Sequence, residues 1–165
     1  MVRVKRSYYL VGLPGSGKSS ILKILSDDFG YPTVDIDELF GMEFHSSYYE
    51  ILRNNGPQMV QKYEKMILKR LLRIEGYIIA TMGFVASKEL FNGTVIYIKV
   101  PRSRCTVITQ KVQGSKRKQL LDLFVQLHDN FSENSHFVIS VENKNRFEIA
   151  NIIDSFVRHS ERENA

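Results

Sequence analysis

The stretch that decides the fold is GLPGSGKS at residues 12–19, which matches the pattern G-x-x-x-x-G-K-[ST] without a mismatch. A short apolar run, Ser7–Val11, precedes it, and Ser19–Phe29 follows with apolar residues at helical spacing. A strand before the loop and a helix after it are the flanks that this pattern requires. The alternative is a glycine turn that carries Gly-Lys-Ser by accident, and the two flanks disfavour it.

Each residue type in the loop suits the binding of phosphate groups. Glycines let the backbone turn tightly and direct its N–H groups at phosphate oxygens, and the positive end of the following helix points the same way. We expect Lys18 to reach the β- and γ-phosphates and Ser19 to offer its hydroxyl to Mg²⁺. ATP and Mg²⁺ are therefore the predicted ligands. The predicted phosphate-binding set is Gly12, Gly15, Ser16, Gly17, Lys18, Ser19 and Ser20.

Apolar runs of strand length alternate with segments of helical periodicity along the rest of the chain. Strands are expected at residues 33–36, 77–80, 95–100 and 137–141, and the longer helices at 59–74, 102–111, 120–131 and 147–157. Such alternation predicts an α/β protein with a parallel sheet covered on both faces. Ligands of these sheets lie beyond the carboxyl ends of the strands, where the loop at 12–19 also lies.

The bulk composition predicts one domain, 1–165, with a bias toward anionic ligands. The chain has 165 residues, is 43% apolar and carries a formal net charge of +5. Its single cysteine, Cys105, allows no intramolecular disulfide, so we expect a cytoplasmic protein, and we also expect a monomer. The apolar run behind the basic N-terminus is too short to span a membrane. Basic residues cluster at Arg3–Arg6 and Lys111–Lys118, and the second cluster leaves nucleic-acid binding open as a weaker alternative.

Two acidic residues, Asp35 and Asp37, come at the end of the second expected strand. Alternation along a strand would direct both carboxylates to one face of the sheet. One carboxylate could then hold Mg²⁺ and the other could accept the proton of an attacking hydroxyl. The alternative is an ordinary helix start, in which Asp37 caps residues 38–41.

Several motifs together resemble the shikimate kinase family. They are the glycine loop, Asp35-x-Asp37, Gly41, Gly56 with Glu64, and Thr81-Met82-Gly83 after the third strand. The resemblance implies a P-loop three-layer sandwich, with five parallel strands in order 2-3-1-4-5, an acceptor-binding region at about 37–65 and a lid at about 111–119. It implies catalytic roles for Lys18, Asp37 and Arg117, metal binding by Ser19 and Asp35, and substrate binding by Asp37, Gln61, Gly83 and Lys118.

Some positions depart from the family pattern. Gln61 stands where the family has an arginine that clamps the substrate carboxylate, and His128 stands where a second arginine is expected. A glutamine does not reproduce a bidentate arginine–carboxylate contact, and the adjacent lysine, Lys62, does not either. Two hypotheses follow. The chain is a small-molecule kinase whose acceptor is shikimate by default or another polyol, sugar acid or nucleotide, or it is an ATP-binding protein without catalysis.

Overall fold

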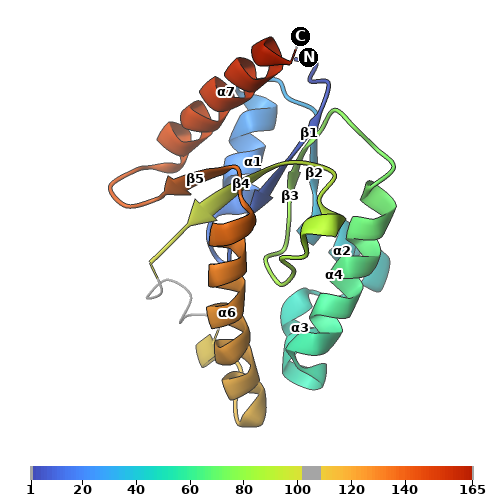
Figure 1. Ribbon diagram of the computed structural model, residues 1–165. Helices are drawn as coiled ribbons and strands as arrows, with labels where there is room; N and C mark the ends of the chain where they lie inside the picture. The colour runs from blue at the N-terminus through green and yellow to red at the C-terminus, as the bar shows by residue number, and fades with distance from the viewer. Residues whose placement is uncertain (1, 102–108, 165) are drawn as a thin grey trace.

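A parallel sheet of five strands forms the centre of the molecule (Figure 1). The structure is a computed structural model that describes residues 2–101 and 109–164. The strands lie in the order β2-β3-β1-β4-β5, and every neighbouring pair is parallel. The predicted order 2-3-1-4-5 is thus confirmed. The strands are β1 Ser7–Val11, β2 Thr33–Asp35, β3 Ile78–Ala80, β4 Gly93–Lys99 and β5 Phe137–Ser140.

Helices cover both faces of this sheet, as the alternating sequence predicted. Helix α1 packs against α7, and α4 packs against α6. The helices are α1 Lys18–Asp27, α2 Ile36–Phe44, α3 Tyr48–Asn55, α4 Pro57–Leu71, the 3₁₀ helix η1 Lys88–Leu90, α6 Ser115–Asn134 and α7 Arg146–Glu163. None of the helices in the described ranges combines the length and the hydropathy needed to span a bilayer.

The central strand β1 explains why the apolar runs of this sequence are continuous rather than alternating. All five of its residues are buried, because helices cover both of its faces. Tyr8, Tyr9 and Leu10 are fully buried on this strand. The sheet core therefore fixes the position of the loop that leaves β1 at its carboxyl end.

Several expected boundaries were wrong, including the following three. Strand β2 ends at Asp35, so Ile36 and Asp37 belong to helix α2. Helix α6 begins at Ser115 rather than Leu120, so the basic residues 116–118 lie in its first turn. Helix α7 continues to Glu163 instead of fraying from His159, and the Tyr8 hydroxyl donates a 3.0 Å hydrogen bond to Glu161. Most of the helix expected at 102–111, with Arg102, Arg104 and Cys105, lies outside the described residues.

Candidate active site

The glycine loop joins the carboxyl end of β1 to the start of α1, as predicted (Figure 1). The Ser16 N–H donates to the Leu13 carbonyl at 3.1 Å, which closes a tight turn. Gly15 and Gly17 have φ values of 84° and 91°, a left-handed conformation that favours glycine. Helix α1 begins at Lys18, so the N–H groups of its first turn have no acceptor within the helix and suit an anion.

The Lys18 ammonium lies inside this loop, 5% exposed. Its Nζ donates to the Gly12 carbonyl at 2.7 Å, to the Leu13 carbonyl at 3.1 Å and to Ser16 Oγ at 3.0 Å. Oxygen atoms of the loop therefore surround the ammonium group of Lys18. Burial raises the pKa of Asp37 and the positive charge of Lys18 opposes this rise, so the loop and the acidic pair form one electrostatic site.

Asp35 and Asp37 come together through a helix start and not through strand alternation, so that part of the sequence interpretation was wrong. Asp35 is the N-cap of α2, and its Oδ1 accepts the Asp37 N–H at 3.0 Å. The alternative with Asp37 as the cap was therefore also wrong. Asp37 lies in the first turn of α2, where its Oδ2 accepts a 3.4 Å hydrogen bond from Ser19 Oγ. The geometry joins the Asp37 carboxylate to the start of α1.

The other carboxylate oxygen of Asp37, Oδ1, is buried and has no hydrogen-bond partner among the residues that the structure describes. Burial raises the pKa of Asp37 to about 6, and the negative charge of Asp35 acts in the same direction. Lys18 and the Ser19 hydroxyl oppose this rise. Buried polar atoms are normally paired, so an unpaired carboxylate oxygen next to a phosphate loop indicates a place for a ligand atom.

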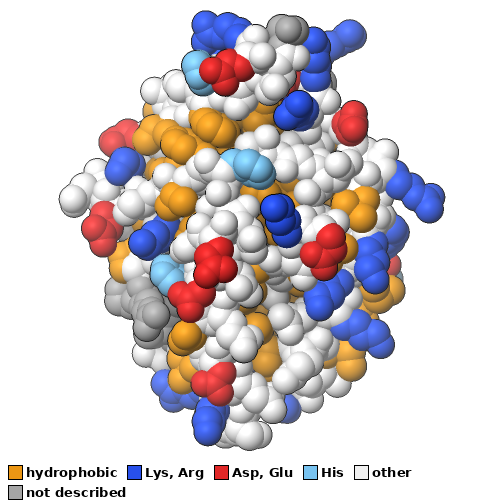
Figure 2. Space-filling view, in the orientation of Figure 1, with side chains coloured by type: hydrophobic (Ala, Val, Ile, Leu, Met, Phe, Trp, Pro, Cys, Tyr) orange, Lys and Arg blue, Asp and Glu red, His pale blue; other side chains and the backbone are white. Residues whose placement is uncertain are grey.

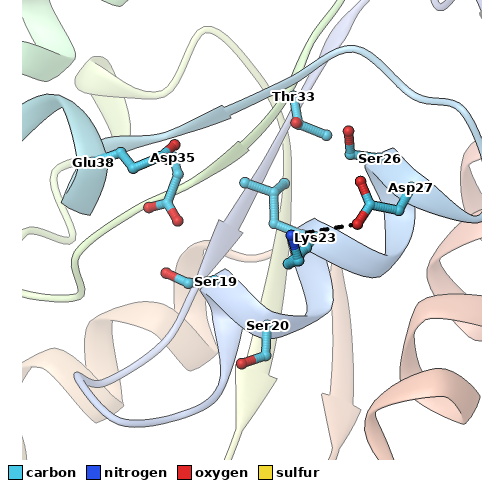
Figure 3. Close-up of a pocket in the computed structure, with 9 residues that line it drawn as sticks. Ser19, Ser20, Lys23, Ser26, Asp27, Thr33, Asp35 and Glu38 are labelled. Carbon is cyan, nitrogen blue, oxygen red and sulfur yellow. Dashed lines mark ion pairs between the residues drawn. The ribbon is translucent and has the colours of Figure 1, made fainter.

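A polar pocket of about 440 Å³ lies beside these groups, between α1 and the β2–α2 junction (Figure 3). Ser19, Asp35 and Glu38 line it, and the Asp35 carboxylate points toward Ser19. Hydroxyl and carboxylate oxygens are the ligands that Mg²⁺ prefers, and Mg²⁺ usually takes only one or two protein ligands beside phosphates and water. The donor set therefore fits the predicted metal. Within residues 2–101 and 109–164, no cluster of three or more His, Cys, Asp or Glu side chains is placed to hold a metal.

Gly83 lies directly against the glycine loop. A Cβ atom at this position would lie 2.3 Å from the Gly12 carbonyl oxygen and 2.8 Å from the Pro14 nitrogen. Its φ of 102° also disfavours any residue with a side chain. The segment that follows β3 is thus in backbone contact with the phosphate loop, and the substrate-binding role that the resemblance implies for Gly83 stays a prediction.

Two side chains of α4 hold the backbone around Gly83. The Glu64 carboxylate accepts the N–H groups of Met82 and Phe84, both at 2.9 Å, and Gln61 Nε2 donates to the Phe84 carbonyl at 2.8 Å. Glu64 is fully buried, which raises its pKa to about 7 although both N–H groups and Lys18 oppose the rise. The Gln61 amide nitrogen is consequently engaged with protein backbone.

The basic residues before and within the first turn of α6 lie against α3. Lys116 Nζ donates to the carbonyls of Arg53 and Asn54, at 2.8 and 3.1 Å, at the carboxyl end of α3. Lys111 Nζ lies 4.8 Å from the centre of the Tyr49 ring. Arg117 and Lys118 are exposed. The expected lid therefore contacts the expected acceptor region through Lys111 and Lys116.

Two residues of this site had no role assigned from the sequence. Glu64 was noted only as part of a motif, yet it occupies a core position of α4 in phase with Val60, Ile67 and Leu68. A charged residue at an apolar phase of a helix is the signal that could have identified it. Phe84 gave no such signal, because a phenylalanine after a strand is expected to be buried in any hydrophobic core.

A parallel sheet of order 2-3-1-4-5, with a phosphate loop between its central strand and its first helix, defines the class of nucleoside-monophosphate-kinase-like P-loop proteins. Within this class, the profile described as Shikimate kinase matches residues 14–158. A shikimate kinase from Persephonella marina is 30% identical over 164 residues, which cover 93% of this chain and 99% of that protein. The chain belongs to the shikimate kinase family.

Solved structures share the fold of this chain. Shikimate kinase from Acinetobacter baumannii in complex with shikimate superimposes with a TM-score of 0.77 at 20% identity, over 95% of each chain. Shikimate kinase from Aquifex aeolicus has a TM-score of 0.70 at 25% identity, over 93% of this chain and 97% of that one. The chain is thus an ATP-dependent kinase that resembles shikimate kinase and acts on a hydroxyl group. Its family implies the use of ATP and Mg²⁺ and a small-molecule acceptor.

Proposed function

We propose that the chain transfers the γ-phosphoryl group of ATP to a hydroxyl of a small molecule held next to Asp37. The observation that carries this proposal is the buried Oδ1 of Asp37, which lies beside the loop of Lys18 and has no hydrogen-bond partner within residues 2–101 and 109–164. The acceptor hydroxyl gives its proton to Asp37, its oxygen bonds to the γ-phosphorus, and the bond from that phosphorus to the bridging oxygen breaks to leave ADP. A carboxylate with a pKa near 6 is ionised at neutral pH and can accept this proton.

The remaining groups bind and orient the reactants. The loop set from Gly12 to Ser20 holds the phosphates, and Lys18 with the lid residue Arg117 stabilises the charge on the transferred group. Mg²⁺, held by Ser19 and Asp35, would neutralise charge on the phosphate oxygens. Gln61, Gly83 and Lys118 would complete the acceptor site, between the acceptor region at about 37–65 and the lid at about 111–119. We also propose that this single domain of residues 1–165 acts as a cytoplasmic monomer.

The test is Asp37→Asn, assayed for ADP release and product formation over a panel of hydroxyl acceptors that begins with shikimate. We expect turnover to fall by about 10²–10⁴-fold with nearly unchanged ATP affinity, because the general base is lost while the loop is intact. Removing a charge that burial disfavours should also raise the melting temperature at pH 8. If Asp37 were only structural, the variant would be less stable and as active as the parent protein.

A catalytically inactive ATP-binding protein is the second candidate, and one contact is relevant to it. Gln61, at a position expected to bind the acceptor, instead donates its amide to the Phe84 carbonyl. This contact is equally consistent with a site that no longer binds any acceptor and with a site that binds a different acceptor. ATP binding without any phosphorylated product across the panel would select this candidate.

Nucleic-acid binding finds less support. On the face shown in Figure 2, basic side chains are interspersed with acidic ones instead of forming one continuous patch. A protein that neutralises several phosphates of a nucleic acid binds with a steep dependence on salt. Binding to oligonucleotides whose log–log salt dependence is flat would remove this alternative.

A further inference from the structure

A second cavity lies at the end of the molecule where both chain ends lie, away from the phosphate loop (Figure 1). Its volume of about 400 Å³ is in the range of small-molecule sites, and it lies between the segment before β1 and the last turns of α7. Its lining residues are Val2, Arg3, Val4, Tyr31, Val157, Arg158, Glu161 and Arg162. The segment before β1 lies at the amino end of that strand and the phosphate loop at its carboxyl end, so the cavity is separate from the kinase site.

The inner wall of this cavity is apolar. Val157 and Tyr31 are buried, at 1% and 2% exposure, and Val2 and Val4 pack against the same core. The Tyr31 hydroxyl donates to Asp154 Oδ1 at 2.6 Å, so this polar atom is already paired. A ligand that enters the cavity must therefore place an apolar body against these side chains, because a polar group would find no partner there.

The charged part of the lining consists of three guanidinium groups and the carboxylate of Glu161. This carboxylate is already engaged, because its Oε1 accepts the Lys5 N–H and its Oε2 accepts the Tyr8 hydroxyl at 3.0 Å. One guanidinium is also paired, since Arg158 Nε donates to Asp154 Oδ1 at 2.8 Å. The remaining two guanidinium groups give the opening of the cavity an excess of positive charge.

These two groups belong to Arg3 and Arg162, and neither forms an ion pair with any residue that the structure describes. The backbone next to Arg3 is held in place, since the Val2 N–H donates to the Gly30 carbonyl at 2.8 Å. Arg162 Nε donates to the Arg158 carbonyl one turn earlier at 3.3 Å, which leaves its terminal nitrogens for a ligand. A guanidinium binds a carboxylate through two parallel hydrogen bonds, so this pair suits an organic acid.

We propose that this cavity is a second binding site, which takes a small organic carboxylate with an apolar body. The carboxylate binds Arg3 and Arg162, and the apolar body lies against Val157 and the Tyr31 ring. A neutral amide of the same shape lacks the charge, and inorganic phosphate lacks the apolar body. The site contains none of the residues that we assign to the nucleotide or the acceptor, so it does not depend on the proposed function.

Methyl NMR of the full chain measures this binding, with MgADP present to occupy the nucleotide site. The probe is phenylacetate, and phenylacetamide is its neutral match. We expect phenylacetate to shift the methyl signals of Val2, Val4 and Val157, and to leave those of Val60, buried on α4, unchanged. Phenylacetamide should bind at least about tenfold more weakly because it has no charge, and inorganic phosphate likewise because it buries no apolar surface.

Arg3→Gln and Arg162→Gln should each weaken phenylacetate binding about tenfold, because each removes a charge-assisted contact. Arg146→Gln is the matched control, since Arg146 is an exposed arginine at the other end of α7 and should leave the Kd unchanged. The melting temperature shows whether each variant is folded. Unshifted cavity valines, equally tight binding of the amide or of phosphate, or parent-level binding by both glutamine variants of the cavity would each overturn the proposal.

Asp37→Asn separates this site from the kinase site. We expect this variant to bind phenylacetate with the Kd of the parent protein, whatever happens to its turnover. A chain that binds phenylacetate at the cavity but transfers no phosphate contradicts the proposed function alone. An active kinase whose cavity valines do not respond to phenylacetate contradicts this inference alone.

Discussion

Lys18 is the residue on which the nucleotide half of the site depends. Its ammonium is almost fully buried and donates to two carbonyls and one hydroxyl of its own loop. Water has little access to such a cation. When phosphate oxygens enter the loop, the ammonium therefore exchanges hydrogen bonds to neutral oxygens for stronger hydrogen bonds to charged oxygens. The site therefore carries its countercharge in place before the nucleotide arrives.

The corresponding prediction is that Lys18→Ala abolishes ATP binding or reduces turnover by at least about 10³-fold, because the charge that faces the phosphates is lost. Calorimetric titration with MgATP and steady-state kinetics measure the two effects. Lys69→Ala, an exposed change on α4, is the control and should behave as the parent protein. Unchanged kinetics in Lys18→Ala would contradict the assignment of the loop.

Asp37 predicts how turnover depends on pH. Its carboxyl pKa is raised to about 6, and only the ionised form can accept a proton from the acceptor. Turnover should therefore be highest above pH 7 and fall about tenfold for each pH unit below 6. A profile of kcat/KM from pH 5 to 8 measures this. A flat profile through pH 6, at unchanged ATP affinity, would show that Asp37 does not act as the base.

At the scale of elements, Gly83 connects the segment after β3 to the phosphate loop. Gly83→Ala adds a methyl group that overlaps the Gly12 carbonyl and strains a backbone with φ of 102°. We expect a loss of about 2–4 kcal/mol in the free energy of unfolding and weaker ATP binding, because the two loops must separate. Urea denaturation and nucleotide titration measure the two effects.

Gly41→Ala is the control for this change. Gly41 lies within α2, and a Cβ there would have no atom of the described residues within 4 Å. The substitution should raise stability by about 0.5–1 kcal/mol, because alanine favours a helix more than glycine does. If both alanine variants behaved alike, close contact at Gly83 would not explain the need for glycine there.

The same elements show what sequence patterns predict and where they stop. The strands were predictable because buried parallel strands are continuous apolar runs, and β1 is such a run that ends at a glycine. The start of α2 was not, since Asp35 ends a strand and caps a helix at once. The start of α6 was missed because residues 115–119 are polar and show no apolar period. Strand order 2-3-1-4-5 came from the resemblance alone.

The site was predictable only in part, for a related reason. The loop residues are contiguous, so one motif identifies them all. The pairing of Gln61 and Glu64 with the backbone of residues 82–84 spans about twenty positions. A contact of that kind depends on how α4 packs against the sheet, and no local pattern encodes it.

At the scale of the whole molecule, Glu64 makes stability depend on pH. Burial raises its folded-state pKa to about 7 from an unfolded value of 4.5, so folding takes up a proton between these values. Its contribution to stability is complete below pH 4.5 and is lost as the pH rises to 7. The free energy of unfolding should thus fall by about 1.4 kcal/mol between pH 6 and 8 from this group.

Glu64→Gln should remove this slope. It should also reduce stability by about 1–3 kcal/mol at every pH, because an amide cannot accept both backbone N–H groups. Urea denaturation at pH 6, 7 and 8 measures both effects, and Glu142→Gln in an exposed turn serves as the control. A parent protein whose stability is the same at pH 6 and 8, or a glutamine variant with the parent's slope, would show that Glu64 does not titrate in this range.

The contact of Gly83 with the Gly12 carbonyl has one more consequence, which concerns the order in which two ligands bind. Helix α4 holds the Gly83 segment on one side, and the phosphate loop touches it on the other. A ligand that shifts this segment alters both surfaces, so the two binding free energies are coupled. Such coupling is reciprocal by thermodynamic necessity. If the bound nucleotide changes the affinity for the acceptor by some factor, the bound acceptor changes the affinity for the nucleotide by the same factor.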